Sequence, residues 1–225
     1  MPREFESRRI IPPPGIVLPS HLIYRFFDHS ITFAPAGTGN DWEIALSNAY
    51  KLAGSYSCKV ATKRTNPTAN DVAYDTWYFS MLPFNVIDVS VDFLTIETDR
   101  KFFLVLSFVS NFISKTEYQQ GQVAIALNTG KVYIYDKNGN PQLVETLGDI
   151  GYGKWVHVEM TIDLIEKKYK TIYIGTTLID VSQWELGLGS GYYGSNAILY
   201  GVISENTGTR GILYIDNVVA KSHLA

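Results

Sequence analysis

Strict alternation of apolar and polar residues is the feature that most constrains what this chain can fold into. In residues 154–163 (KWVHVEMTID) every second position from 156 to 162 is apolar, and residues 86–97 (VIDVSVDFLTIE) alternate in the same way. A period of two places successive side chains on opposite faces of a β-strand. The continuous apolar run at 101–110 (KFFLVLSFVS) is typical of a strand that is covered on both sides.

Turn residues divide these strands. Residues 122–145 predict a meander, because Asn128-Thr129-Gly130 and Asn138-Gly139 tolerate the positive φ that tight turns require. Residues 154–163 and 169–175 predict another hairpin. The one helix candidate is 40–54 (NDWEIALSNAYKLAG), which a loop with an incidental apolar pattern explains equally well. Many short strands joined by turns predict an all-β, two-sheet antiparallel sandwich.

Composition limits the classes of function. With 46% hydrophobic and 18% charged residues, the chain can bury a large core in one domain. A net charge of -3 without a basic stripe excludes nucleic acid as an expected partner. Cys58 is the single cysteine, so no intrachain disulfide can form, and we expect a buried, inert thiol. No segment is long and apolar enough to span a membrane.

The first residues are rich in proline and predict an extended arm. We place the arm at 1–21 and the sandwich domain at 22–225. Pro12, Pro13, Pro14 and Pro19 interrupt the apolar residues there, so we predict no secretory signal. Synthesis in the cytoplasm follows, with release on a virion or particle surface, or loss of a signal or a larger parent protein, as alternatives. We expect the arm to contact neighbouring subunits and to drive self-association.

Three stretches resemble the concanavalin A-like lectin and glucanase superfamily, which includes laminin-G-like jelly rolls. They are AGSYSCKVAT (53–62), GKWVHVEMTIDLIEKKYKTIYIGTTLID (153–180) and GILYIDNVVA (211–220), similar in order to an early strand, a tryptophan-bearing hairpin and a final strand of that superfamily. The resemblance implies a jelly-roll fold. It says little about function, because this superfamily holds binding modules, hydrolases and lyases alike.

The polar face of residues 154–163 carries Trp155, His157, Glu159 and Thr161, opposite the apolar core face. That face is either solvated or the side on which the superfamily places its ligands. A zinc site would need a third ligand, and the other histidines lie near the termini. We therefore interpret Trp155 and His157 as ligand-binding candidates without a metal.

The sequence offers few candidates for catalytic residues. Retaining glucanases of the superfamily carry alternating acids on one strand, whereas the E-x-D pattern here, Glu97 and Asp99, stands where an apolar strand ends in a turn. Related lyases use clustered tyrosine and histidine, and Tyr133, Tyr135 and His157 are residues of that kind whose convergence spacing cannot show. We predict no catalytic residues and a protein that is not an enzyme.

Asp216 in YIDNVV has two explanations. In related modules the acid of this strand can bind a structural Ca²⁺, an ion that takes oxygen ligands. A hydrogen bond to a neighbouring loop explains the same residue without metal. No other cofactor is expected.

Two aromatic clusters are candidate binding surfaces. Tyr192 and Tyr193 lie in a glycine-rich loop, WELGLGSGYYGSNA (184–197), and Tyr74, Trp77 and Tyr78 form a second cluster at the end of a polar loop. Aromatic rings stack on sugars and also anchor protein interfaces. The alternative is that the loop tyrosines fold back onto the sandwich.

These observations favour a non-catalytic, lectin-like surface or assembly protein, for instance a virion structural or decoration protein. The alternative is a carbohydrate-binding module that recognises a polysaccharide. A polysaccharide lyase or glycoside hydrolase is the third class.

Overall fold

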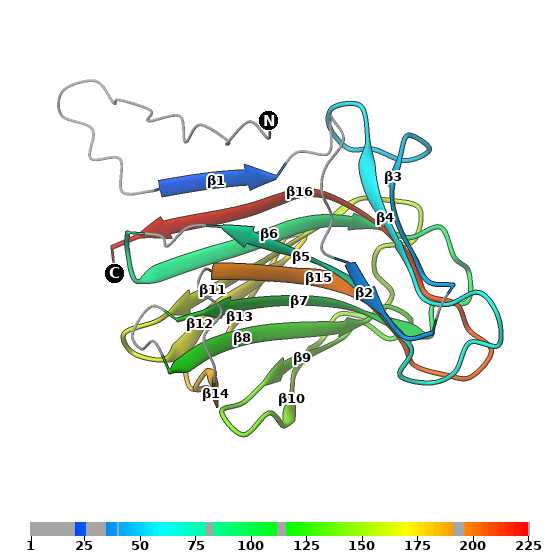
Figure 1. Ribbon diagram of the computed structural model, residues 1–225. Helices are drawn as coiled ribbons and strands as arrows, with labels where there is room; N and C mark the ends of the chain where they lie inside the picture. Colours follow the sequence, from blue (N-terminus) through cyan, green and yellow to red (C-terminus); the bar gives the residue numbers. More distant parts are fainter. Residues whose placement is uncertain are drawn as a thin grey trace.

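The chain folds into two eight-stranded sheets (Figure 1). The computed structural model describes residues 21–25, 35–39, 41–79, 83–111, 116–190 and 196–224, and within those ranges it contains no helix. All pairings between its strands are antiparallel. The predicted all-β, two-sheet sandwich is confirmed.

Sheet A contains, in spatial order, β13 (Thr177–Asp180), β12 (Lys168–Ile174), β11 (Val156–Asp163), β6 (Val86–Leu94), β16 (Ile212–His223), β4 (Ser57–Ala61) and β3 (Glu43–Ser47), and β1 (His21–Arg25) pairs with β16. Sheet B contains β10 (Pro141–Thr146), β9 (Lys131–Tyr135), β8 (Glu117–Ala126), β7 (Phe102–Ser110), β15 (Asn196–Ser204), β5 (Val72–Phe79) and β2 (Pro35–Gly37), and β14 (Gly187–Ser190) pairs with β8.

The core lies between the two sheets and is built from alternate residues of each strand. In β11 the side chains of Val158, Met160 and Ile162 are fully buried, which confirms the predicted core face. In β7 it is Leu104, Leu106 and Phe108 that are fully buried. Burying such a side chain stabilises the fold by roughly 1.5–3 kcal/mol. Cys58 of β4 is also fully buried, as expected of an inert thiol.

The predicted turns are present. Gly130 has φ of 65° between β8 and β9, and Gly139 has φ of 76° between β9 and β10, in the left-handed region that glycine tolerates. A Cβ on Gly130 would also lie 1.8 Å from the Gly148 carbonyl oxygen. The β8–β9–β10 meander and the β11–β12 hairpin are therefore as predicted.

The helix alternative for residues 40–54 is wrong, because residues 43–47 form β3 instead. Ile44 lies opposite Val60 of β4, and its side chain packs against the core. The Glu43 carboxylate accepts a hydrogen bond from Lys59 Nζ at 2.8 Å. Pairing with β4 satisfies backbone groups along the strand, and this tertiary contact outweighs local helix propensity.

The predicted arm (1–21) lies, up to Ser20, outside the described residues. The first described segment, β1, pairs with residues 218–222 of β16 (Figure 1). The part of the chain that the structure describes contains no helix of the length and hydropathy needed to cross a membrane.

Candidate functional site

The outward side of sheet B gathers most of the tyrosines of its strands. Because the core-facing residues of these strands alternate with the ones that face away, register and burial identify the outward set. We call the following part of this set the tyrosine face: Tyr74, Thr76 and Tyr78 of β5, Ala197, Leu199 and Gly201 of β15, Val105 and Ser107 of β7, Gln120, Gln122 and Ala124 of β8, and Tyr133 and Tyr135 of β9. Phe103 of β7 and Lys131 of β9 lie on the same side of sheet B, in the row next to that of Tyr133.

One row of residues crosses five strands of this face. Tyr74 lies opposite Gly201, Gly201 opposite Val105, Val105 opposite Ala124, and Ala124 opposite Tyr133. The two tyrosines therefore stand on strands separated by roughly 19 Å, four spacings of about 4.8 Å, with smaller side chains between them. Gly201 allows this arrangement, because a Cβ there would lie 2.3 Å from the Ala73 carbonyl oxygen.

Amide and hydroxyl groups occupy the neighbouring rows. Ser107 lies opposite Gln122, and Gln120 is on the same face two residues before Gln122. Gln120 Nε2 donates to Ser107 Oγ at 3.0 Å and to Gln122 Oε1 at 3.1 Å. These two bonds hold the amides side by side.

Tyr169 of β12 reaches across the core to support this face from behind. Its hydroxyl accepts the Gln122 backbone N–H at 2.9 Å and donates to the Tyr135 carbonyl oxygen at 2.8 Å. The side chain is fully buried, and burial raises the pKa of Tyr169 to about 12, so its hydroxyl stays protonated.

That hydroxyl lies where β8 changes partner. The same edge of β8 pairs with β9 over residues 123–126 and with β14 over residues 117–120. Gln122 lies between the two segments, and Tyr169 takes the place of a ladder partner there. Two residues of the tyrosine face, Gln122 and Tyr135, are thus positioned by one residue of the opposite sheet.

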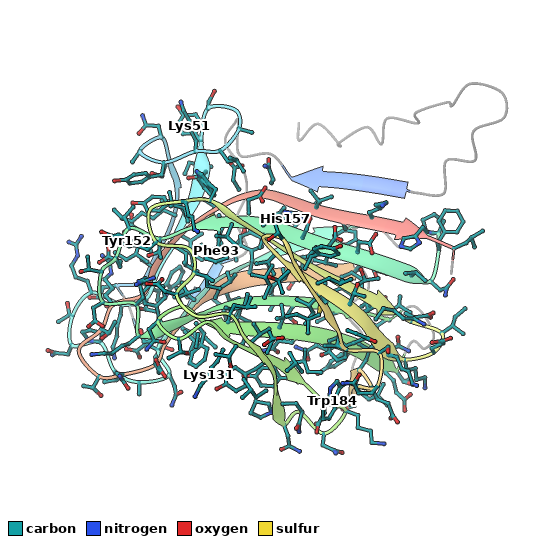
Figure 2. The ribbon with its side chains drawn as sticks, turned by 180° about the vertical axis from the view of Figure 1, so that it is seen from behind. Lys51, Phe93, Lys131, Tyr152, His157 and Trp184 are labelled. Atoms are coloured by element: carbon teal, nitrogen blue, oxygen red, sulfur yellow. The ribbon has the colours of Figure 1, made fainter. Side chains whose placement is uncertain are left out.

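The outward side of sheet A carries ionisable groups instead. Figure 2 shows the molecule from behind, with His157 of β11 labelled. His157 Nδ1 lies 2.9 Å from Asp92 Oδ1 of β6, and Thr161 donates to Asp88 at 2.8 Å. Asp88 is also 3.2 Å from His223 Nε2.

The pKa values of His157 and Glu159 on this side are shifted upward. The hydrogen bond to Asp92 raises the pKa of His157, although burial opposes the shift. Burial, together with the charge of Asp88, raises the pKa of Glu159. Among the described residues no group of three or more histidine, cysteine, aspartate or glutamate side chains is arranged to hold a metal ion.

Asp216 of β16 makes hydrogen bonds to a neighbouring loop, which was the explanation of this residue that needs no metal. Its Oδ2 accepts the backbone N–H groups of Leu52 and Ala53, at 3.0 and 3.2 Å, in the loop between β3 and β4. Its Oδ1 accepts the Asn217 N–H at 2.8 Å. Both oxygens are therefore engaged, and calcium binding by Asp216 stays an untested prediction.

The predicted binding residues do not meet on one surface. Tyr78 belongs to the tyrosine face and is 51% exposed, whereas its neighbour Trp77 points inward and packs on Phe79 with ring centroids 5.0 Å apart. Trp155 and His157 belong to sheet A, on the other side of the sandwich. Tyr192 and Tyr193 lie outside the described residues.

The catalytic candidates are separated as well. Tyr133 and Tyr135 of sheet B do not converge with His157 of sheet A. Asp99, in the loop that follows β6, accepts a hydrogen bond from Thr209 Oγ1 of the loop between β15 and β16 at 3.1 Å, in agreement with a turn. Sequence reasoning missed Gln120 and Gln122, although the alternation of EYQQGQVAIA indicates their common face.

Comparisons with known proteins agree with the fold and assign no family. No family model matches the sequence, and no curated protein matches it. Among solved structures, the cellulose-induced protein Cip1 is similar with a TM-score of 0.57 and 10% identity over 90% of this chain and 98% of that one. The alginate lyase vAL-1 from Chlorella virus is similar with a TM-score of 0.51 and 11% identity over 81% of this chain and 90% of that one.

A carbohydrate-binding module, CBM66 from Bacillus subtilis, covers 84% of this chain and 95% of its own, with 13% identity and a TM-score of 0.44, a likeness too weak to build on. At 10 and 11% identity, the likenesses to Cip1 and to the alginate lyase show a shared two-sheet fold and no family. They correct one prediction. The expectation that the protein is not an enzyme is wrong as an inference from the sequence, because an alginate lyase shares this fold over nearly its whole length.

Proposed function

We propose that this protein holds a polysaccharide on the tyrosine face of sheet B. The observation that carries the proposal is the row from Tyr74 to Tyr133, in which two tyrosine side chains on separate strands flank smaller side chains. Aromatic rings present large, rigid apolar surfaces with a polar tip, and the C–H faces of sugar rings stack on such surfaces. Amides beside them supply hydrogen bonds that fix orientation.

The likeness in fold to an alginate lyase and to a cellulose-induced protein supports a polysaccharide ligand. The proposal concerns recognition, so it covers a binding module and equally an enzyme that holds its polymer on this face. Among the functions predicted from sequence, the comparisons fit the carbohydrate-binding alternative better than a virion or assembly role. Self-association through the arm gains no support, since residues 1–20 are not described.

The test is a panel of soluble polysaccharides assayed by affinity electrophoresis and calorimetry. Tyr133→Ala and Tyr78→Ala are each expected to weaken binding about tenfold, which corresponds to about 1.4 kcal/mol. Tyr173→Ala is the matched control, because Tyr173 is 40% exposed on the outward side of sheet A, opposite Glu159. Equal losses from the control and from Tyr133→Ala would refute the assignment to sheet B. Release of reducing ends from a bound polymer would identify an enzyme.

A further inference from the structure

The amides of the tyrosine face are arranged to meet hydroxyl groups. Gln120 uses its Nε2 to bond both Ser107 and Gln122. Neither bond uses Gln120 Oε1 or Gln122 Nε2, so an acceptor and a donor remain next to each other on neighbouring positions of β8. Each hydroxyl of a sugar both donates and accepts a hydrogen bond. A pair of adjacent hydroxyls therefore matches this pair of amides.

Ionisable side chains are divided between the two sides of the molecule. The outward side of sheet A carries Asp88, Asp92, Glu159, His157, Lys221 and His223. On the tyrosine face, as far as its described residues go, the polar side chains are tyrosine, glutamine, serine and threonine. Burial raises the pKa of Tyr135, so its hydroxyl is uncharged at neutral pH. Lys131 of β9 lies on the same side of sheet B, two residues before Tyr133 and opposite Ala126, which is four residues along β8 from Gln122.

This distribution of ionisable side chains favours a ligand of a particular charge on the tyrosine face. A carboxylate or sulfate placed over the Gln120 and Gln122 amides would lose water without gaining a cationic partner beside them, because Lys131 lies opposite Ala126, four residues further along β8, and such a loss is costly. A hydroxyl that moved onto the same face would exchange water for an amide at little cost. We propose that the polysaccharide held on the tyrosine face is uncharged and hydroxyl-rich. This inference rests on the proposed function of the face.

The experiment compares polymers that share a backbone and differ in charge. Hydroxyethyl cellulose is paired with carboxymethyl cellulose, and neutral β-glucan, xylan and galactomannan are set against alginate, polygalacturonate and κ-carrageenan. We expect at least one neutral polymer to bind, with a Kd that changes less than twofold between 50 and 500 mM NaCl. Charged contacts would be screened over that range. An anionic polymer that binds more tightly than every neutral one, with a Kd that rises more than tenfold with salt, would overturn the inference.

Two variants separate this inference from the proposed function. Gln122→Glu is expected to weaken binding of the neutral polymer at least tenfold. Gln122→Lys is expected to shift the binding preference toward carboxymethyl cellulose over hydroxyethyl cellulose. If only anionic polymers bind and Tyr133→Ala abolishes their binding, the tyrosine face is the binding site, but the inference that its ligand is uncharged is wrong. If no polymer of either kind binds, the proposed function and this inference both fall.

Discussion

His157 and Asp92 form an imidazole–carboxylate pair that makes stability depend on pH. The hydrogen bond to Asp92 raises the pKa of His157 above its ordinary value of 6.5. The folded protein therefore binds this proton more tightly than the unfolded chain does. The stabilisation is complete below about pH 6.5 and is lost as the pH rises through the folded pKa. We expect the free energy of unfolding of wild type to exceed that of His157→Gln by more at pH 5.5 than at pH 8.5.

Urea unfolding of both proteins at the two pH values measures this difference, and an NMR titration of the His157 ring gives its pKa directly. Burial raises the pKa of Glu159 as well, which shifts stability in the same direction, but Glu159 is present in both proteins. A difference between wild type and variant that does not change with pH would contradict the prediction.

The His157–Asp92 pair shows which features a residue pattern can predict and which it cannot. Alternation identified the buried side of β11, because a half-buried strand needs one apolar face. It could not identify Asp92 as the neighbour of His157, since that contact depends on the register of β11 against β6, two strands far apart in sequence. Trp77 and Tyr78 show a related limit. Adjacent residues in a strand point to opposite sides, so they cannot form one outward cluster.

At the scale of elements, Tyr169 joins β12 of one sheet to β8 and β9 of the other. Tyr169→Phe removes the hydroxyl and leaves the Gln122 N–H and the Tyr135 carbonyl without this partner. We expect the free energy of unfolding to fall by about 1–3 kcal/mol, the cost of leaving buried polar groups unbonded. Native-state hydrogen exchange should show faster exchange of the Gln122 amide.

Tyr200→Phe is the control for that experiment. Tyr200 is also fully buried, and its hydroxyl donates to Asp75 at 2.6 Å, but it belongs to β15. The control should lose stability without faster exchange at Gln122. If both variants accelerate exchange at Gln122 equally, the effect of Tyr169 is global and it does not position the β8–β9 junction.

Hairpins between strands that are neighbours in sequence were predictable, because short turns connect their strands. The meander of β8, β9 and β10 has turns in which Gly130 and Gly139 adopt positive φ, and the β11–β12 hairpin joins two strands that are close neighbours in sequence. The placement of β15 in sheet B and of β16 in sheet A was not predictable, because each pairs with strands distant in sequence. The same holds for β3, whose short pattern suits a helix until β4 lies beside it.

At the scale of the whole molecule, the tyrosine face exists only after the sandwich has closed. Its tyrosines come from β5 and β9, and β15, β7 and β8 lie between those strands in the sheet, although β15 follows all of them in sequence. Both sheets have a polar outward side, so alternation alone cannot show which side binds a ligand. Sequence reasoning therefore named candidates on both sides, Trp155 and His157 at sheet A and Tyr78 on sheet B, without showing on which side the tyrosines gather.

A short strand near the start of the chain, β1, covers part of one edge of β16 in sheet A. One edge of β16 pairs with β4 over residues 212–215 and with β1 over residues 218–222. A variant that lacks residues 1–25 loses β1 and leaves the backbone groups of 218–222 unpaired along that edge. Exposed strand edges pair with other chains. We expect this variant to self-associate, with a mass by light scattering that rises with protein concentration, and to melt at a lower temperature.

A variant that lacks residues 1–20 and keeps β1 is the matched control. It should remain at the mass of the full chain, because the edge of β16 stays covered. Each kcal/mol lost on removing β1 should lower the Tm by about 2–4 °C for a domain of this size. Identical mass and Tm in the two variants would show that β1 contributes nothing to closing sheet A. Self-association of both variants would instead place the protective role in residues 1–20.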